Sequence, residues 1–137
     1  MSSDRRPIAL LGLLGAAVIT TVVTHLVYVA QHLPEQGGDG VPYVLAGWLS
    51  FAFVFYALGR LATTADSLPS MRTGDAGVGL VLASLLLAGA LDAFGFELGT
   101  VPEAYVLPAI GLYVGLALLG WSLGRRTAAI NRIAAED

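Results

Sequence analysis

The stretch IALLGLLGAAVITTVVTHLVYVAQHL, residues 8–33, contains no charged side chain. An α-helix rises ~1.5 Å per residue, so about 20 apolar residues are enough to cross the ~30 Å hydrocarbon core of a bilayer. This stretch therefore predicts a transmembrane helix. The composition agrees, because 56% of the 137 residues are hydrophobic and only 12% are charged, which is unlike an ordinary soluble domain.

Three further segments are long and predominantly apolar, and connections rich in glycine, proline and polar residues separate them. We therefore expect an all-α membrane protein, a bundle of four transmembrane helices that forms one domain over residues 1–137. The expected helices lie at about 8–33, 43–61, 76–98 and 104–123. Asp75 is the expected N-cap of the third.

The positions of the arginines predict the orientation. All seven basic residues are arginines, and they fall on one side of the expected spans: Arg5, Arg6, Arg60, Arg72, Arg125, Arg126 and Arg132. The two connections on the other side carry only the acids Glu35, Asp39 and Glu103. Short loops rich in basic residues stay in the cytoplasm. The sequence therefore predicts a multipass protein of the cell membrane with both termini cytoplasmic; the lipid bilayer is its expected partner, and nucleic acid is not.

A weak internal repeat relates the two halves of the chain. The connection before the second span reads GVPYVL from Gly40, and the one before the fourth reads VPEAYVL from Val101. The same two spans end as YALGR at 56–60 and WSLGR at 121–125. Two pseudo-equivalent helical hairpins, related by an axis along the membrane normal, explain the repeat. Convergent chemistry at the membrane boundary is the alternative.

Asp92 is the most informative residue within the expected spans, because a carboxylate in a membrane helix costs roughly 2.5–3.5 kcal/mol on insertion scales. It would lie ~9 Å from the outer end of a helix over 76–98, and His25 ~12 Å from the outer end of a helix over 8–33. The similar depths predict that His25 and Asp92 form a polar pair across the bundle. Such a pair would serve either as a structural hydrogen bond or as a proton-binding element.

Small residues predict where helices pack closely. Asp92 is surrounded at helical spacing by small residues, and the fourth span contains two small-xxx-small patterns, Gly111 with Gly115 and Gly120 with Gly124. Such residues let two backbones approach each other in a membrane. The expected packing face comprises Ser84, Ala88, Gly95, Gly99, Gly111 and Gly115, and self-association through the fourth span is one possible use of it.

The sequence contains no recognisable set of catalytic residues, phosphate-binding loop or metal-ligand cluster, so we expect neither enzyme activity nor a cofactor. The absence of cysteine excludes thiolate metal sites and thiol redox chemistry. His25 and His32 lie ~10.5 Å apart along one helix, too far to hold a single haem iron.

Three functional interpretations remain open. The leading one is an accessory or structural subunit, or a homo-oligomer, that acts through helix packing with itself or with another membrane protein. The alternative is a small proton- or cation-coupled transporter or channel that uses Asp92 and His25. A lipid- or quinone-binding subunit of a membrane enzyme is the third, because polar residues along the first span could form the floor of a headgroup pocket.

Overall fold

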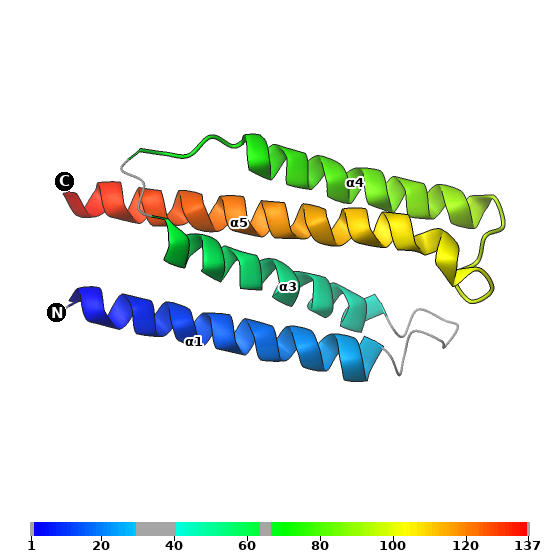
Figure 1. Cartoon of the computed structure of the whole chain (residues 1–137), viewed down its shortest axis with the longest axis horizontal. Coiled ribbons are helices and arrows are strands. Elements are labelled where there is room, and N and C mark those ends of the chain that lie inside the picture. The colour runs from blue at the N-terminus through cyan, green and yellow to red at the C-terminus, as the bar shows by residue number, and fades with distance from the viewer. Residues whose placement is uncertain (1, 30–40, 64–66, 137) are drawn as a thin grey trace.

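The computed structural model describes residues 2–29, 41–63 and 67–136 (Figure 1). Within these ranges all regular structure is helical, and four helices are long and apolar enough to cross a membrane. They are α1 (Ser2–Val23, continued by the π-helix η1, Thr24–Val29), α3 (Val41–Ala62), α4 (Arg72–Ala93) and α5 (Val106–Glu136), the last preceded by the 3₁₀-helix η2 (Pro102–Tyr105). His32, Glu35 and Asp39 lie outside the described residues, as does the expected end of the first helix.

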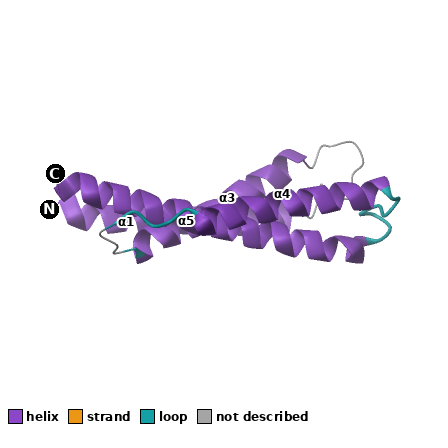
Figure 2. Cartoon of the chain, turned by 90° about the horizontal axis from the view of Figure 1, so that it is seen from above, coloured by secondary structure: helices purple, strands orange, loops and turns teal. Residues whose placement is uncertain are grey.

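The helices lie side by side in the order α1, α3, α5, α4 (Figure 1), and seen from above they cross and diverge, so the layer is twisted (Figure 2). Helix α3 packs against α1 and α5, and α5 packs against α3 and α4. Helices α1 and α4 therefore form opposite edges of an open bundle. Both termini and the connection from α3 to α4 lie at one end of the layer, and the connection from α4 to α5 lies at the other.

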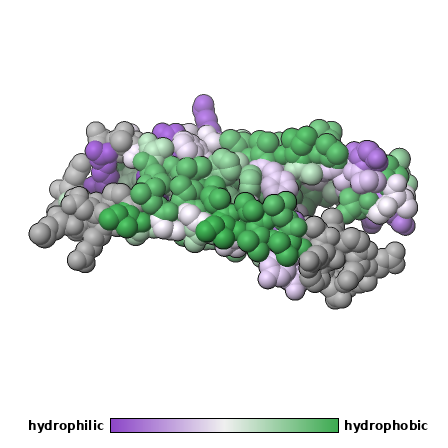
Figure 3. All heavy atoms as spheres, turned by 60° about the horizontal axis from the view of Figure 1, so that its bottom comes forward, coloured by the Kyte–Doolittle hydropathy of each residue, from purple (hydrophilic) through white to green (hydrophobic). Residues whose placement is uncertain are grey.

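Large apolar side chains point outward and small ones point inward. Green hydrophobic atoms cover the middle of the molecule, whereas the most hydrophilic residues lie mostly toward the two ends (Figure 3). Leu86 on α4 is 76% exposed and Leu107 on α5 is 69% exposed, and no large side chain is fully buried in the described part of the chain. The buried apolar residues are mainly alanines, so the helices meet through small residues.

Glycines bring the helices into backbone contact at both seams of α5. A Cβ atom built on Gly77 of α4 would lie 2.6 Å from the Gly115 carbonyl oxygen, and one built on Gly115 would lie 2.6 Å from the Gly77 carbonyl oxygen. On the other side, a Cβ on Gly59 of α3 would lie 3.1 Å from the Arg125 nitrogen. Larger side chains at these positions would force the helices apart.

Helix α4 ends at Ala93 and not at the expected residue 98. Gly95 adopts a φ of +92°, a conformation that glycine tolerates and other residues rarely adopt. The Gly95 N–H bonds the Asp92 carbonyl at 3.0 Å, and the Phe96 N–H bonds the Leu91 carbonyl at 2.9 Å. This is the Schellman pattern of hydrogen bonds, which satisfies the last carbonyls and stops the helix.

The other helix ends also differ from the expected ones. Helix α4 begins at Arg72, so Asp75 lies in its first turn and is not its N-cap; the Arg72 N–H instead bonds the Ser70 hydroxyl at 3.3 Å. Helix α5 continues past residue 123 to Glu136, because no glycine or proline follows Gly124. Helix α3 agrees with the expected 43–61 to within two residues.

Candidate functional site

A polar cluster within the helices centres on His25, which is partly buried between α1, α3 and α5. The His25 Nδ1 atom lies 2.8 Å from the Thr21 carbonyl oxygen, and the Nε2 atom lies 2.6 Å from the Tyr113 hydroxyl. A carbonyl only accepts, so Nδ1 carries a proton and donates it. In the neutral imidazole Nε2 is then the acceptor, and the Tyr113 O–H donates to it.

Two residues of α3 complete the cluster. The Trp48 indole N–H, which can only donate, forms a side-chain hydrogen bond with the Tyr113 hydroxyl. The resulting chain of donors runs from Trp48 through Tyr113 and His25 to the Thr21 carbonyl, with every polar atom paired. Gly47 makes room for the imidazole, because a Cβ at this position would lie 2.8 Å from His25 Cε1.

His25 sits at a local irregularity of the first helix. It is the second residue of η1, and a π-helix bonds residue i to residue i+5, which widens the turn. Just before it, the Thr21 hydroxyl donates to the Ala17 carbonyl at 2.7 Å. The Thr21 hydroxyl and both ring nitrogens of His25 are therefore bonded to their own helix or to α5.

The predicted contact between His25 and Asp92 is not formed. Asp92 lies in the last turn of α4, at the edge of the layer opposite α1, and it is exposed. Both ring nitrogens of His25 already have other partners. A buried Asp92 requires a helix that reaches residue 98, whereas α4 ends one residue after Asp92.

Four of the six residues of the predicted packing face lie between α4 and α5. Gly111 contacts the Ser84 hydroxyl, Gly115 contacts the Gly77 backbone, and Ala88 lines a cavity between these helices. Gly95 and Gly99 are the exceptions: they follow the end of α4, and a Cβ on either would meet nothing within 4 Å. The second small-residue pattern, Gly120 with Gly124, packs against α3. Both patterns of α5 are therefore occupied within the chain.

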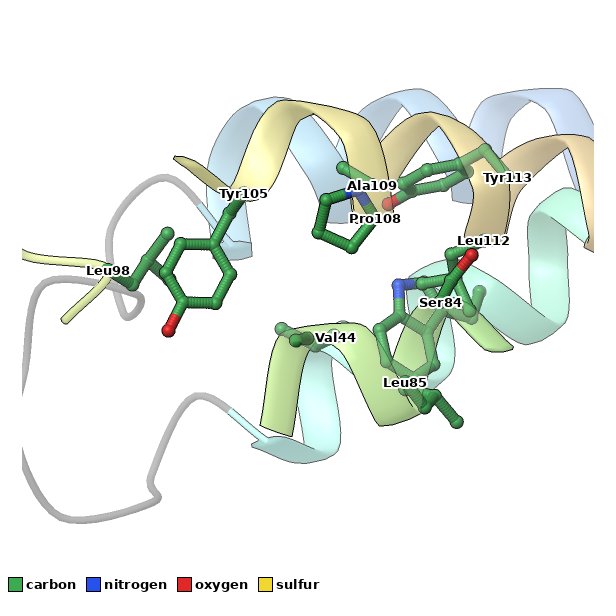
Figure 4. A pocket seen from close by; sticks show the side chains of 11 residues that line it. Val44, Ser84, Leu85, Leu98, Tyr105, Pro108, Ala109, Leu112 and Tyr113 are labelled. Carbon is green, nitrogen blue, oxygen red and sulfur yellow. The ribbon is translucent and has the colours of Figure 1, made fainter. Parts of the chain in front are cut away.

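An apolar cavity of about 300 Å³ adjoins the cluster, between α3, α4 and α5 (Figure 4). Leu98 and Tyr105 lie at one end of it, and Ser84 and Tyr113 at the other. The Tyr105 hydroxyl donates to the Phe96 carbonyl, which holds η2 against the turn after α4. The cavity offers apolar contact and few polar groups, so it suits a small apolar molecule or a segment of lipid chain.

Tyr113, Trp48 and Gly47 are functional candidates that spacing did not identify. Tyr113 stands between Gly111 and Gly115, so a polar aromatic flanked by two small residues was a usable signal. The cluster joins three helices by hydrogen bonds; the same tyrosine–imidazole geometry could also pass a proton. In the described part of the chain no three histidine or acidic side chains are placed to hold a metal ion.

Comparisons with protein families, with curated proteins and with solved structures each find no match.

Proposed function

We propose that this chain is an integral membrane protein whose four helices cross the bilayer, with both termini in the cytoplasm. Helices α3 and α4 have 22 residues each, ~33 Å at the helical rise, which matches the hydrocarbon core. Large apolar side chains face outward, as lipid allows, and small residues form the contacts between helices. These features support insertion.

The distribution of charge supports the orientation. Arg60 near the end of α3, Arg72 at the start of α4, and Arg125, Arg126 and Arg132 on α5 lie toward the end that carries the termini. Asp92, Glu97 and Glu103 lie toward the other end. By the positive-inside rule the arginine end is cytoplasmic.

The packing of α3 on α5 supports two pseudo-equivalent hairpins. Gly59 meets the Trp121 carbonyl and the Arg125 nitrogen, whereas Gly124 meets the Tyr56 carbonyl and the Arg60 nitrogen. These contacts are reciprocal between the repeats YALGR and WSLGR. A two-fold axis along the helices would exchange α3 with α5 and α1 with α4, in agreement with their order in the layer.

The function best supported is that of an accessory or structural subunit, or a homo-oligomer, that acts through helix packing. One observation carries it: the bundle is open, so α1 and α4 each make their main contacts with a single neighbour and leave apolar faces along both edges. The polar cluster, by contrast, is satisfied within the chain. The edges are thus the surfaces left for another helix.

Native mass spectrometry of the tagged protein, extracted from its own membranes in mild detergent, tests this function. The expected result is a particle that contains several copies or a second protein in fixed ratio. A particle of one chain in every mild detergent, with no co-purifying protein, would rule the packing function out. The alternative of proton or cation transport has less support, because the pair of His25 and Asp92 on which it depended is not formed.

A further inference from the structure

An open apolar groove of about 580 Å³ runs along the seam between α3 and α5. Leu45 and Trp48 line it toward one end, and Tyr56 and Leu123 line it toward the end of the molecule that carries the termini. Along α3, the distance from Leu45 to Tyr56 is ~16 Å at the helical rise. This is about half of the ~30 Å hydrocarbon core, and because α3 runs from Val41 to Ala62 the groove crosses the middle of the core.

Arg60 stands at the inner end of this groove. Its Cζ atom lies 5.7 Å from the centroid of the Tyr56 ring, and Tyr56 itself lines the groove. The Arg60 Nε atom is buried and has no hydrogen-bond partner in the described part of the chain. A buried donor without a partner costs about 1–3 kcal/mol, and more for a charged group, and an anion paired with the guanidinium would offset part of that cost.

We propose that the groove binds an anionic phospholipid, with an acyl chain along the α3–α5 seam and the phosphate on the Arg60 guanidinium. The inference rests on the proposed membrane location. Arginine presents several N–H donors in a planar fork that suits phosphate oxygens. A lipid is favoured over free phosphate because Tyr56 lies under the guanidinium and also lines the apolar groove, which makes the anion site and the chain site continuous.

Trp48 provides a reporter, because it lines the groove. The test uses a Trp121→Phe background, so that Trp48 is the only tryptophan, reconstituted into phosphatidylcholine vesicles. Two lipids are compared at equal mole fraction: brominated phosphatidylglycerol and brominated phosphatidylcholine. Both carry the bromine atoms in the half of the acyl chain nearer the terminal methyl group. We expect the brominated phosphatidylglycerol to quench Trp48 at least twofold more strongly, and Arg60→Gln to abolish this preference.

Arg72→Gln is the matched control. It removes the same charge from the same end of the molecule, but it lies on α4, which contributes no residue to the groove. The lipid preference should therefore survive in Arg72→Gln. Equal loss in both variants would show a general attraction of anionic lipid to the basic end, and persistence in Arg60→Gln would show that this arginine is not the anion site; either result overturns the proposal.

The parent protein decides the proposal even if Arg60→Gln does not fold. Equal quenching by the two brominated lipids would mean that the groove holds lipid without selection, which overturns the inference. Displacement of the brominated phosphatidylglycerol by inorganic phosphate alone would identify a phosphate site without a chain site, and would also overturn it. A chain that does not insert into vesicles would instead contradict the proposed membrane function.

Discussion

His25 connects residues that are distant in the sequence. Its Nε2 atom reaches Tyr113 on α5, 88 positions along the chain, and its ring rests on Gly47 of α3. Hydrogen bonds between membrane helices contribute about 0.6 kcal/mol on average and rarely more than about 1.7 kcal/mol. A cluster in which Trp48, Tyr113, His25 and Thr21 bond in series should lie in the upper part of that range.

A double-mutant cycle measures this coupling. We predict that His25→Ala and Tyr113→Phe each destabilise the protein by about 1–3 kcal/mol, because each leaves polar atoms unpaired, with a coupling of about 0.5–1.5 kcal/mol between them. Unfolding in mixed micelles provides the measurement. His25→Ala with Tyr56→Phe is the control and should be additive, since in the described part of the chain the Tyr56 hydroxyl makes no hydrogen bond with the cluster. A zero coupling with Tyr113 would contradict the cluster.

The existence of polar residues in the spans was predictable, but their partners were not. The rise per residue predicts a position for His25 along its helix, but it does not predict which residues of other helices surround it. The lateral order α1, α3, α5, α4 is set by which small residues meet, and no local pattern encodes it. The misplacement of Asp92 has a different reason: Gly95 fits a helix face by spacing, but glycine followed by an apolar residue also signals a helix end.

At the scale of the helices, the glycine seams determine which elements pack together. Close contact between two backbones requires that no side chain intervene, so Gly77 and Gly115 are needed on facing surfaces of α4 and α5. Gly79, two residues along α4, would place a Cβ in open space. Gly77 and Gly79 lie two residues apart on the same helix at a similar depth. They differ in that Gly77 faces the backbone of α5 and Gly79 faces open space.

We predict that Gly77→Ala destabilises the protein by about 1–3 kcal/mol, the usual cost of forcing extra atoms into a packed interface. Gly79→Ala should leave stability unchanged or raise it slightly, because alanine loses less backbone conformational entropy than glycine when the helix forms. Thermal unfolding of the two variants in one detergent is the comparison. If both variants melt with the parent, α4 and α5 are not in backbone contact.

The presence of the four long helices was easier to predict from the sequence than the residues at which they begin and end. Each of the four expected apolar segments overlaps most of one long helix of the structure, because the length of an uncharged run is a strong local signal. Helix ends depend on single local features, such as the hydrogen bond from the Arg72 N–H to the Ser70 hydroxyl at the start of α4 and the positive φ of Gly95 after its end. The extension of α5 to Glu136 shows that charged residues such as Arg125 and Arg126 bound an apolar run without ending a helix.

At the scale of the molecule, a single layer of helices has two apolar faces and two apolar edges. A soluble protein would expose too much apolar surface in this form, whereas a bilayer solvates it. The reciprocal contacts of Gly59 and Gly124 place the proposed two-fold axis at the centre of the layer, between the repeats that the sequence contains. Such a layer therefore requires a membrane around it, and the proposed orientation places the arginine end of the helices inside.

Labelling of single cysteines tests this requirement directly, because the chain has no cysteine of its own. Ser67→Cys and Ala134→Cys lie toward the arginine end and Thr100→Cys toward the other, and all three positions are exposed. With a membrane-impermeant maleimide on intact cells, we predict that Thr100→Cys is labelled, and that Ser67→Cys and Ala134→Cys are labelled only after permeabilisation. Labelling of Ser67→Cys or Ala134→Cys in intact cells, or recovery of the protein in the soluble fraction, would contradict the account.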